Sequence, residues 1–229
     1  MTTAPAASRM TPAVRMGVSI ALAVGLYGIS FGALGVASGL SVLQTCALSA
    51  LMFTGGSQFA FIGVVSGGGT LPAAFAAASL LGVRNAVYAV QLNALLKPPW
   101  ALRPLQAHLT IDESTATAAA QLDPAEQRRG FWTAGVGVWI LWNSFTLVGA
   151  LIGSALGDPA AWGLDGAAVA AFLGLLWPRL RQRDPVVVAV VAAFVTLVAV
   201  PFVPPGIPII LAAAASAVIA VWQHRRARD

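Results

Sequence analysis

The sequence predicts an all-α polytopic membrane protein with about seven hydrophobic segments, some of them short or broken helices. Of the 229 residues, 58% are hydrophobic and only 9% are charged, whereas soluble domains carry about 25% charged residues. The stretch 16–96 contains a single charged side chain, that of Arg84. The apolar runs lack sustained alternation and are too long for barrel strands, so strands are not expected.

Seven apolar segments can be drawn along the chain, at 17–37, 42–65, 71–96, 131–156, 160–177, 186–200 and 207–222. A helix needs about 20 residues to span a bilayer, so the last three segments are short. We expect a single membrane domain at 14–223, after a disordered tail at 1–13 and before a basic cytoplasmic tail at 224–229. Prolines fix the ends of the short segments, at Pro178, Pro201, Pro204, Pro205 and Pro208.

The formal net charge of +5 indicates membrane topology and not nucleic-acid binding, because the basic residues cluster at the ends of apolar segments. The positive-inside rule places the basic loop 179–183, the C-terminus and the polar loop 97–130 in the cytoplasm. Three full spans before that polar loop would leave the N-terminus outside, although it carries Arg9 and Arg15. Alternatively, one glycine-rich early segment enters and leaves on the same side. We favour the external N-terminus.

The polar loop 97–130 carries two helix-start signals. Thr110 with Glu113 resembles a capping box, and Asp123, Pro124 and Glu126 supply an N-cap, a first-turn proline and a first-turn acid. Short helices are therefore expected before the fourth segment.

Glycines four residues apart predict close packing between helices, because small residues let backbones approach in lipid. The spaced glycines are Gly28 and Gly32, Gly35 and Gly39, Gly63 and Gly67, and Gly149, Gly153 and Gly157.

The second segment is interrupted midway by small and polar residues, which predicts a helix break. An unwound turn in hydrocarbon is tolerated only where it lines a cavity or is buried in protein, as at the substrate sites of transporters. The alternative is an intact helix that packs through its glycines and bonds its hydroxyls to preceding carbonyls. The residues concerned are Thr54, Gly55, Gly56, Ser57 and Gln58.

Arg84 is a functional-site candidate because a charge inside a bilayer normally faces protein or a water-filled path. Helical spacing places Tyr88 and Gln91 on the same face. The guanidinium could hold a substrate carboxylate, cap the carbonyls of the broken helix, or pair with Asp165, the only acid inside the apolar segments. Asp165 could instead relay a proton or cap a helix.

An enzyme, a metal site and a cofactor are not expected. His108 and His224 lie outside the segments, so no histidine within a span can serve as a base. The segments hold no cluster of metal ligands, and nucleotide-binding patterns are absent.

Five short motifs occur in order: YGISFG at 27–32, FTGGSQF at 53–59, RNAVY at 84–88, IDES at 111–114, and WGLD at 162–165 leading to LWP at 176–178. Together they resemble the AzlC family of bacterial branched-chain amino acid permeases. The resemblance implies the large subunit of a two-component exporter in the cytoplasmic membrane, with a small AzlD-type membrane partner and an ion gradient as the driving force. Where the family pattern has Ser and His, this chain has Gly56 and Asn85.

We therefore expect a secondary transporter that exports branched-chain or similar apolar amino acids. In this hypothesis the backbone of the broken helix and Ser57 bind the substrate carboxylate, Gln58 takes the ammonium, and phenylalanines hold the side chain. A passive channel and a structural or assembly subunit of a transport complex remain alternatives. The expected substrate-binding residues are Phe31, Phe53, Thr54, Gly55, Gly56, Ser57, Gln58, Phe59, Arg84, Asn85 and Tyr88, with Asp165 and Arg84 as the coupling or structural charges.

Overall fold

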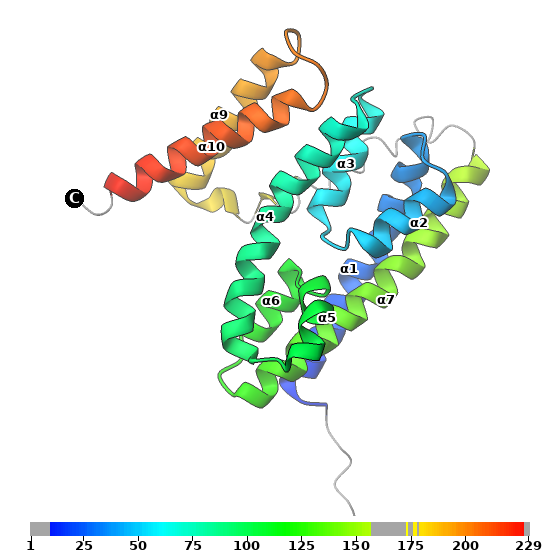
Figure 1. Ribbon diagram of the computed structural model, residues 1–229, viewed down its shortest axis with the longest axis vertical. Coiled ribbons are helices and arrows are strands. Elements are labelled where there is room, and N and C mark those ends of the chain that lie inside the picture. Colours follow the sequence, from blue (N-terminus) through cyan, green and yellow to red (C-terminus); the bar gives the residue numbers. More distant parts are fainter. Residues whose placement is uncertain (1–9, 157–172, 174–175, 178, 227–229) are drawn as a thin grey trace, which may run out of the picture.

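The computed structural model describes residues 10–156, 173, 176–177 and 179–226, which form helices joined by short turns (Figure 1). No strand occurs among these residues, so the predicted all-α class is confirmed for them. Within the described ranges, three helices are long and apolar enough to cross a bilayer, namely α1 (Pro12–Ala37), α4 (Leu71–Leu96) and α7 (Pro124–Leu156). They contain the first, third and fourth predicted segments.

Side-chain caps start all three long helices. Thr11 and Thr70 accept hydrogen bonds from backbone N–H groups in the first turns of α1 and α4, where a proline also lies. The carboxylate of Asp123 accepts from the N–H of Glu126 at 3.1 Å, which confirms the predicted start of α7.

The predicted capping box at Thr110 is wrong. The Thr110 hydroxyl donates to the carbonyl of Gln106 at 2.7 Å, so it closes the preceding turn and caps nothing after it. The next helix, α6 (Asp112–Ala119), starts after Ile111, whose N–H donates to Ser114 Oγ at 3.1 Å.

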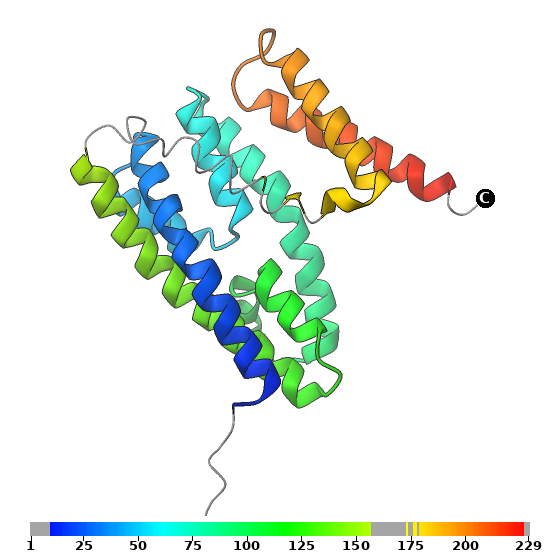
Figure 2. The same ribbon diagram turned by 180° about the vertical axis from the view of Figure 1, so that it is seen from behind.

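Helices α1 and α7 run side by side in the same direction (Figure 2). Gly17 of α1 faces Ala134 of α7, Gly28 faces Trp142, and Gly153 of α7 faces Ala33. A Cβ atom on Gly28 would lie 2.6 Å from the Trp142 carbonyl oxygen, which real side chains do not tolerate. The starts of α1 and α7 therefore lie at the same end of the bundle.

The glycine prediction is confirmed at this interface, where Gly28, Gly32, Gly149 and Gly153 all meet the facing helix. It is wrong at Gly63, where an added Cβ atom would meet no neighbouring segment within 4 Å. The other spaced glycines differ in their surroundings. Gly35 packs on Thr45, and Gly39 lies in a turn with φ of +90°. Gly67 makes ordinary van der Waals contacts, and Gly157 lies outside the described residues.

The second predicted segment is broken into two half-length helices, α2 (Val42–Leu51) and α3 (Gly56–Ser66). With 10 and 11 residues, each is about 15 Å long at 1.5 Å per residue, which is half of a bilayer core of about 30 Å. Together with the turn 52–55 we call them the first hairpin. The predicted helix break is thus confirmed.

The first hairpin enters and leaves the bundle at the same end. Its first helix begins beside the end of α1, where Gly35 meets Thr45. Its second helix ends beside the start of α4, where Val64 clusters with Ala74. Because Arg128 Nε donates to the carbonyl of Leu96 at 3.3 Å, α4 runs from that end toward the start of α7.

The expectation of three full spans before the central loop is therefore wrong, because only α1 and α4 cross the bundle there. The N-terminal end of α1 and the segment that leads into α7 lie at the same end, where Gln121 Nε2 approaches Met16 Sδ at 3.9 Å.

The polar segment 97–130, expected to lie outside the bilayer, folds back into the bundle from that end. After the short helix η1 (Trp100–Leu102), α5 (Arg103–His108) rises toward the middle and α6 returns beside α7. Thr110 reaches Asn85 in the middle of α4, and Thr117 packs against Gly130 near the start of α7. We call residues 103–119 the second hairpin.

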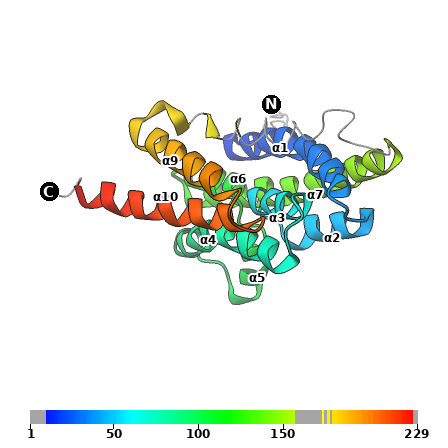
Figure 3. The same ribbon diagram turned by 90° about the horizontal axis from the view of Figure 1, so that it is seen from above.

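Two further helices, α9 (Arg183–Ala199) and α10 (Ile207–Arg226), follow η3 (Arg179–Arg181) and form a pair on the α4 side of the bundle (Figure 3). They contain the sixth predicted segment except for its last residue, Val200, and the whole of the seventh. The turn between them contacts the end of the first hairpin, since Gly206 lies beside Val64 and Ala73. Most of the fifth predicted segment, with Asp165, lies outside the described residues.

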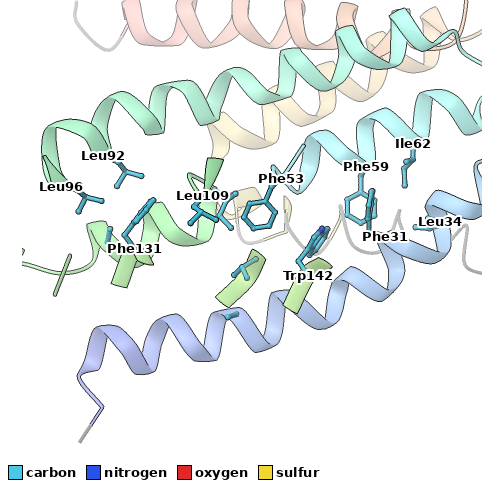
Figure 4. Packing of buried hydrophobic residues seen from close by; sticks show 14 residues of the cluster. Phe31, Leu34, Phe53, Phe59, Ile62, Leu92, Leu96, Leu109, Phe131 and Trp142 are labelled. Atoms are coloured by element: carbon cyan, nitrogen blue, oxygen red, sulfur yellow. The ribbon is translucent and has the colours of Figure 1, made fainter. Parts of the chain in front are cut away.

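An aromatic core joins α1, α3 and α7 (Figure 4). Phe31 is fully buried, and its ring centroid lies 5.4 Å from that of Phe59 and 5.9 Å from that of Trp142. This cluster fixes the first hairpin against the two parallel helices.

Candidate functional site

The tips of the two hairpins meet beside the middle of α4. The rings of Phe53, in the turn of the first hairpin, and His108, at the end of α5, have centroids 6.0 Å apart. From α4, Arg84 contacts both tips: Nη2 donates to the Thr54 carbonyl at 3.0 Å, and Nη1 lies 2.8 Å from Asp112 Oδ2. The next residue, Asn85, donates to the Thr110 carbonyl at 2.9 Å.

The break in the first hairpin depends on its glycines. Gly55 adopts φ of +62° and ψ of −95°, a combination that residues with a Cβ atom rarely adopt. A Cβ atom on Gly56 would lie 3.1 Å from Arg84 Nη2, so a glycine there lets the guanidinium reach the turn. The turn leaves the Thr54 carbonyl without a helical partner, and Arg84 supplies one.

Binding of carbonyls at the helix break was one of the roles expected for Arg84, and the structure places its Nη2 on the Thr54 carbonyl of the turn. Its acidic partner is Asp112, from the segment expected to be a loop. Both side chains keep about a third of their surface exposed, 33% and 36%, because they border a cavity.

This cavity has a volume of about 670 Å³, within the usual range for small-molecule sites. Its wall is mainly apolar and aromatic, with a charged part formed by Arg84, Asp112 and Glu113. Among the residues expected from the sequence, those that line it are Phe53, Thr54, Gly55, Gly56, Phe59 and Arg84. The sequence reasoning missed Tyr27, Ile111, Asp112, Glu113, Val138 and Trp142, which also line it.

The other expected residues lie behind the wall. Gln58 is fully buried, and its Nε2 donates to the carbonyls of Leu48 at 3.3 Å and Ser49 at 3.0 Å, which ties α3 to α2. Ser57 is 1% exposed and lies beside Gly82 of α4.

Phe31 supports Phe59 and Trp142 from within the core. Asn85 holds the second hairpin, and Tyr88 lies one turn further along α4 without lining the cavity.

One signal in the sequence could have revealed the missed acids. Asp112 and Glu113 belong to one of the motifs that repeat the family pattern, and polar residues in such a motif are candidates for a site. Both acids lie in a polar segment, and a hydropathy pattern predicts that such a segment is a loop outside the bundle.

The described part of the chain holds no group of three or more His, Cys, Asp or Glu side chains that could bind a metal ion. At the meeting point of the two hairpins, the arrangement is a mainly apolar pocket with one ion pair and one further acid.

A family model of known proteins matches the chain. The model of the AzlC protein family matches residues 19–156, more than half of the chain, and this range contains both hairpins, α4, α7 and most of α1. No curated protein and no solved structure matches the chain.

Proposed function

Since the chain belongs to the AzlC family, a family associated with membrane transport, we propose that it is a secondary transporter that exports branched-chain or similar small apolar amino acids. In this proposal it works in the cytoplasmic membrane, together with a small AzlD-type membrane subunit.

The observation that carries the proposal is the cavity where the two hairpin tips meet. Discontinuous helices that meet within the bilayer form the substrate sites of many secondary transporters, because their ends offer unpaired backbone groups. Here the tips bring together a mainly apolar wall and the Arg84–Asp112 ion pair. Such a pocket suits a ligand with one apolar and one charged part.

A zwitterionic amino acid needs partners for both of its charges. In this proposal the guanidinium of Arg84 and the backbone N–H groups at the start of α3 bind its carboxylate. The carboxylates of Asp112 and Glu113 bind its ammonium. Aromatic side chains around the cavity then receive the apolar side chain, namely Tyr27, Phe53, Phe59 and Trp142.

The opposed hairpins suggest how access alternates. Each enters from a different end, and two neighbouring side chains of α4 contact the tips: Arg84 binds the Thr54 carbonyl of the first hairpin and Asp112 of the second, and Asn85 binds the Thr110 carbonyl of the second. Release of one hairpin would open the cavity toward one side of the membrane while the other stays closed, as alternating access requires.

The charge distribution supports an orientation for this transporter. The end where the second hairpin enters carries Arg15, Arg128 and Arg129. The turns at the opposite end, 38–41, 67–70 and 200–206, carry no charged residue. The positive-inside rule then places the second hairpin and both chain ends on the cytoplasmic side.

Efflux of radiolabelled leucine from preloaded cells that express the chain, with and without the small partner, tests the proposal. Phe59→Ala, in the cavity wall, is compared with Phe75→Ala, whose side chain is 61% exposed on the surface of α4. We expect saturable efflux that Phe59→Ala weakens and Phe75→Ala leaves unchanged at matched membrane levels.

Flux that does not saturate would favour a passive channel. Absence of efflux for every apolar amino acid, with the partner present, would refute the proposed substrate class. Binding of leucine only by the partner would favour a role in assembly.

A further inference from the structure

Glu113 is the one acid of the cavity wall that has no basic partner among the described residues. The nearest cation, Arg84, pairs with the neighbouring Asp112 at 2.8 Å. Glu113 lies in the first turn of α6, at the tip of the second hairpin, and lines the cavity beside the largely apolar wall. Neither of the two ion pairs found among the described residues includes Glu113.

The charges of the site therefore balance only when Glu113 is neutralised. Arg84 and Asp112 cancel one another, so an ionised Glu113 leaves one negative charge inside the bundle. Such a charge is costly at bilayer depth and among apolar walls. A proton removes the cost. The ammonium group of a bound amino acid lowers it by pairing with Glu113, while the carboxylate of the same amino acid is bound by Arg84 and the N–H groups at the start of α3.

We propose that Glu113 is the proton-binding residue of this transporter, and that a proton and the substrate ammonium compete for its carboxylate. This inference rests on the proposed function. When the amino acid binds, the proton leaves Glu113 for water; when the amino acid leaves, a proton returns. The protein then exchanges one for the other, and protons entering the cell drive the amino acid out.

Other ionisable groups around the cavity are less suited to this role. Asp112 is held by Arg84, and Tyr27 of α1 is a phenol that stays protonated near neutral pH. His108 lies behind Phe53 and does not line the cavity. Within the described residues, α7 and the first hairpin contribute only uncharged side chains to the wall.

The test measures leucine binding by the purified full-length chain with its small partner at several pH values. In the wild type we expect the apparent affinity to rise with pH and a proton to be released for each leucine bound. Glu113→Gln should lose both the proton release and the pH dependence, and Glu113→Asp should keep them with a shifted pH profile. Glu126→Gln, outside the cavity, serves as the matched control and should behave as the wild type does.

Infrared difference spectra provide a readout that needs no substrate. The band of a protonated carboxylic acid should titrate in the wild type and in Glu126→Gln and disappear in Glu113→Gln. Wild-type proton release and an unchanged carboxylic acid band in Glu113→Gln would overturn the assignment. If the wild type binds no amino acid but the band is lost in Glu113→Gln, the proton site stands and the proposed substrate class fails.

Discussion

The guanidinium of Arg84 lies 2.8 Å from the carboxylate of Asp112, which joins the middle of a membrane-spanning helix to the tip of a hairpin that enters from the cytoplasmic end of the proposed orientation. The same guanidinium holds the carbonyl of Thr54, at the tip of the opposite hairpin. One side chain therefore connects three segments that are distant in the sequence, and its loss should affect all of them.

Removal of either partner of the Arg84–Asp112 pair should destabilise the protein, because the remaining charge is left unpaired in the bundle. In a double-mutant cycle with Arg84→Ala and Asp112→Ala, we expect a coupling free energy of roughly 0.5–3 kcal/mol in chemical unfolding. The pair Arg129–Glu126, at 2.6 Å and outside the cavity, is the control and should give a smaller coupling free energy. Additive effects of the two cavity mutations would contradict the role of the pair.

Substitution of glycines by alanine should distinguish the positions where the packing of α1 against α7 requires a glycine from positions where packing does not. Gly32→Ala and Gly149→Ala place a methyl group against the backbone of the facing helix, so each should lower the free energy of unfolding by about 1–3 kcal/mol. Gly63→Ala enters open space within a helix and should raise it by about 0.5–1 kcal/mol. Thermal unfolding in one detergent compares the three, and equal effects would refute the packing argument.

Cysteine labelling should place the N-terminal end of α1 and the start of α7 on the same side of the membrane. The single natural cysteine is first removed by Cys46→Ser. An impermeant thiol reagent should then reach Met10→Cys and Leu122→Cys from the same side, and Ser66→Cys from the other. Labelling of Met10→Cys and Leu122→Cys from opposite sides would restore the third full span before the central loop.

The sequence was sufficient to predict the long helices, because unbroken apolar runs of the right length leave few alternatives in a bilayer. The range 71–96 agrees with α4 at both ends. It also predicted the break at 54–58, from glycines and hydroxyl groups in an apolar run. The reversal of the chain at that break could not be predicted, because a segment as long as 42–65 could equally cross the bilayer with a kink. The reversal depends on the φ of Gly55 and on the bonds of Gln58 to α2, which the local pattern does not encode.

The candidate site was predicted in part for a similar reason. Residues around the break share one short motif, so Phe53, Thr54, Gly55, Gly56 and Phe59 could be found together. The acids came from a polar stretch whose hydropathy indicates a loop, and Trp142 came from a helix that reaches the cavity only through the α1–α7 packing. Such long-range partners follow from tertiary structure and not from the local pattern.

The second hairpin also implies an order in which the parts of the protein are inserted and packed. Its helices, of 6 and 8 residues, are too short and too polar to be inserted as spans when they leave the ribosome. Leu109, Ser114 and Thr117 pack against Gly135 and Gly130 of α7, a helix that is synthesised later. The second hairpin can pack into the bundle only after α7 has been inserted. The cavity therefore forms only after α7 has been synthesised.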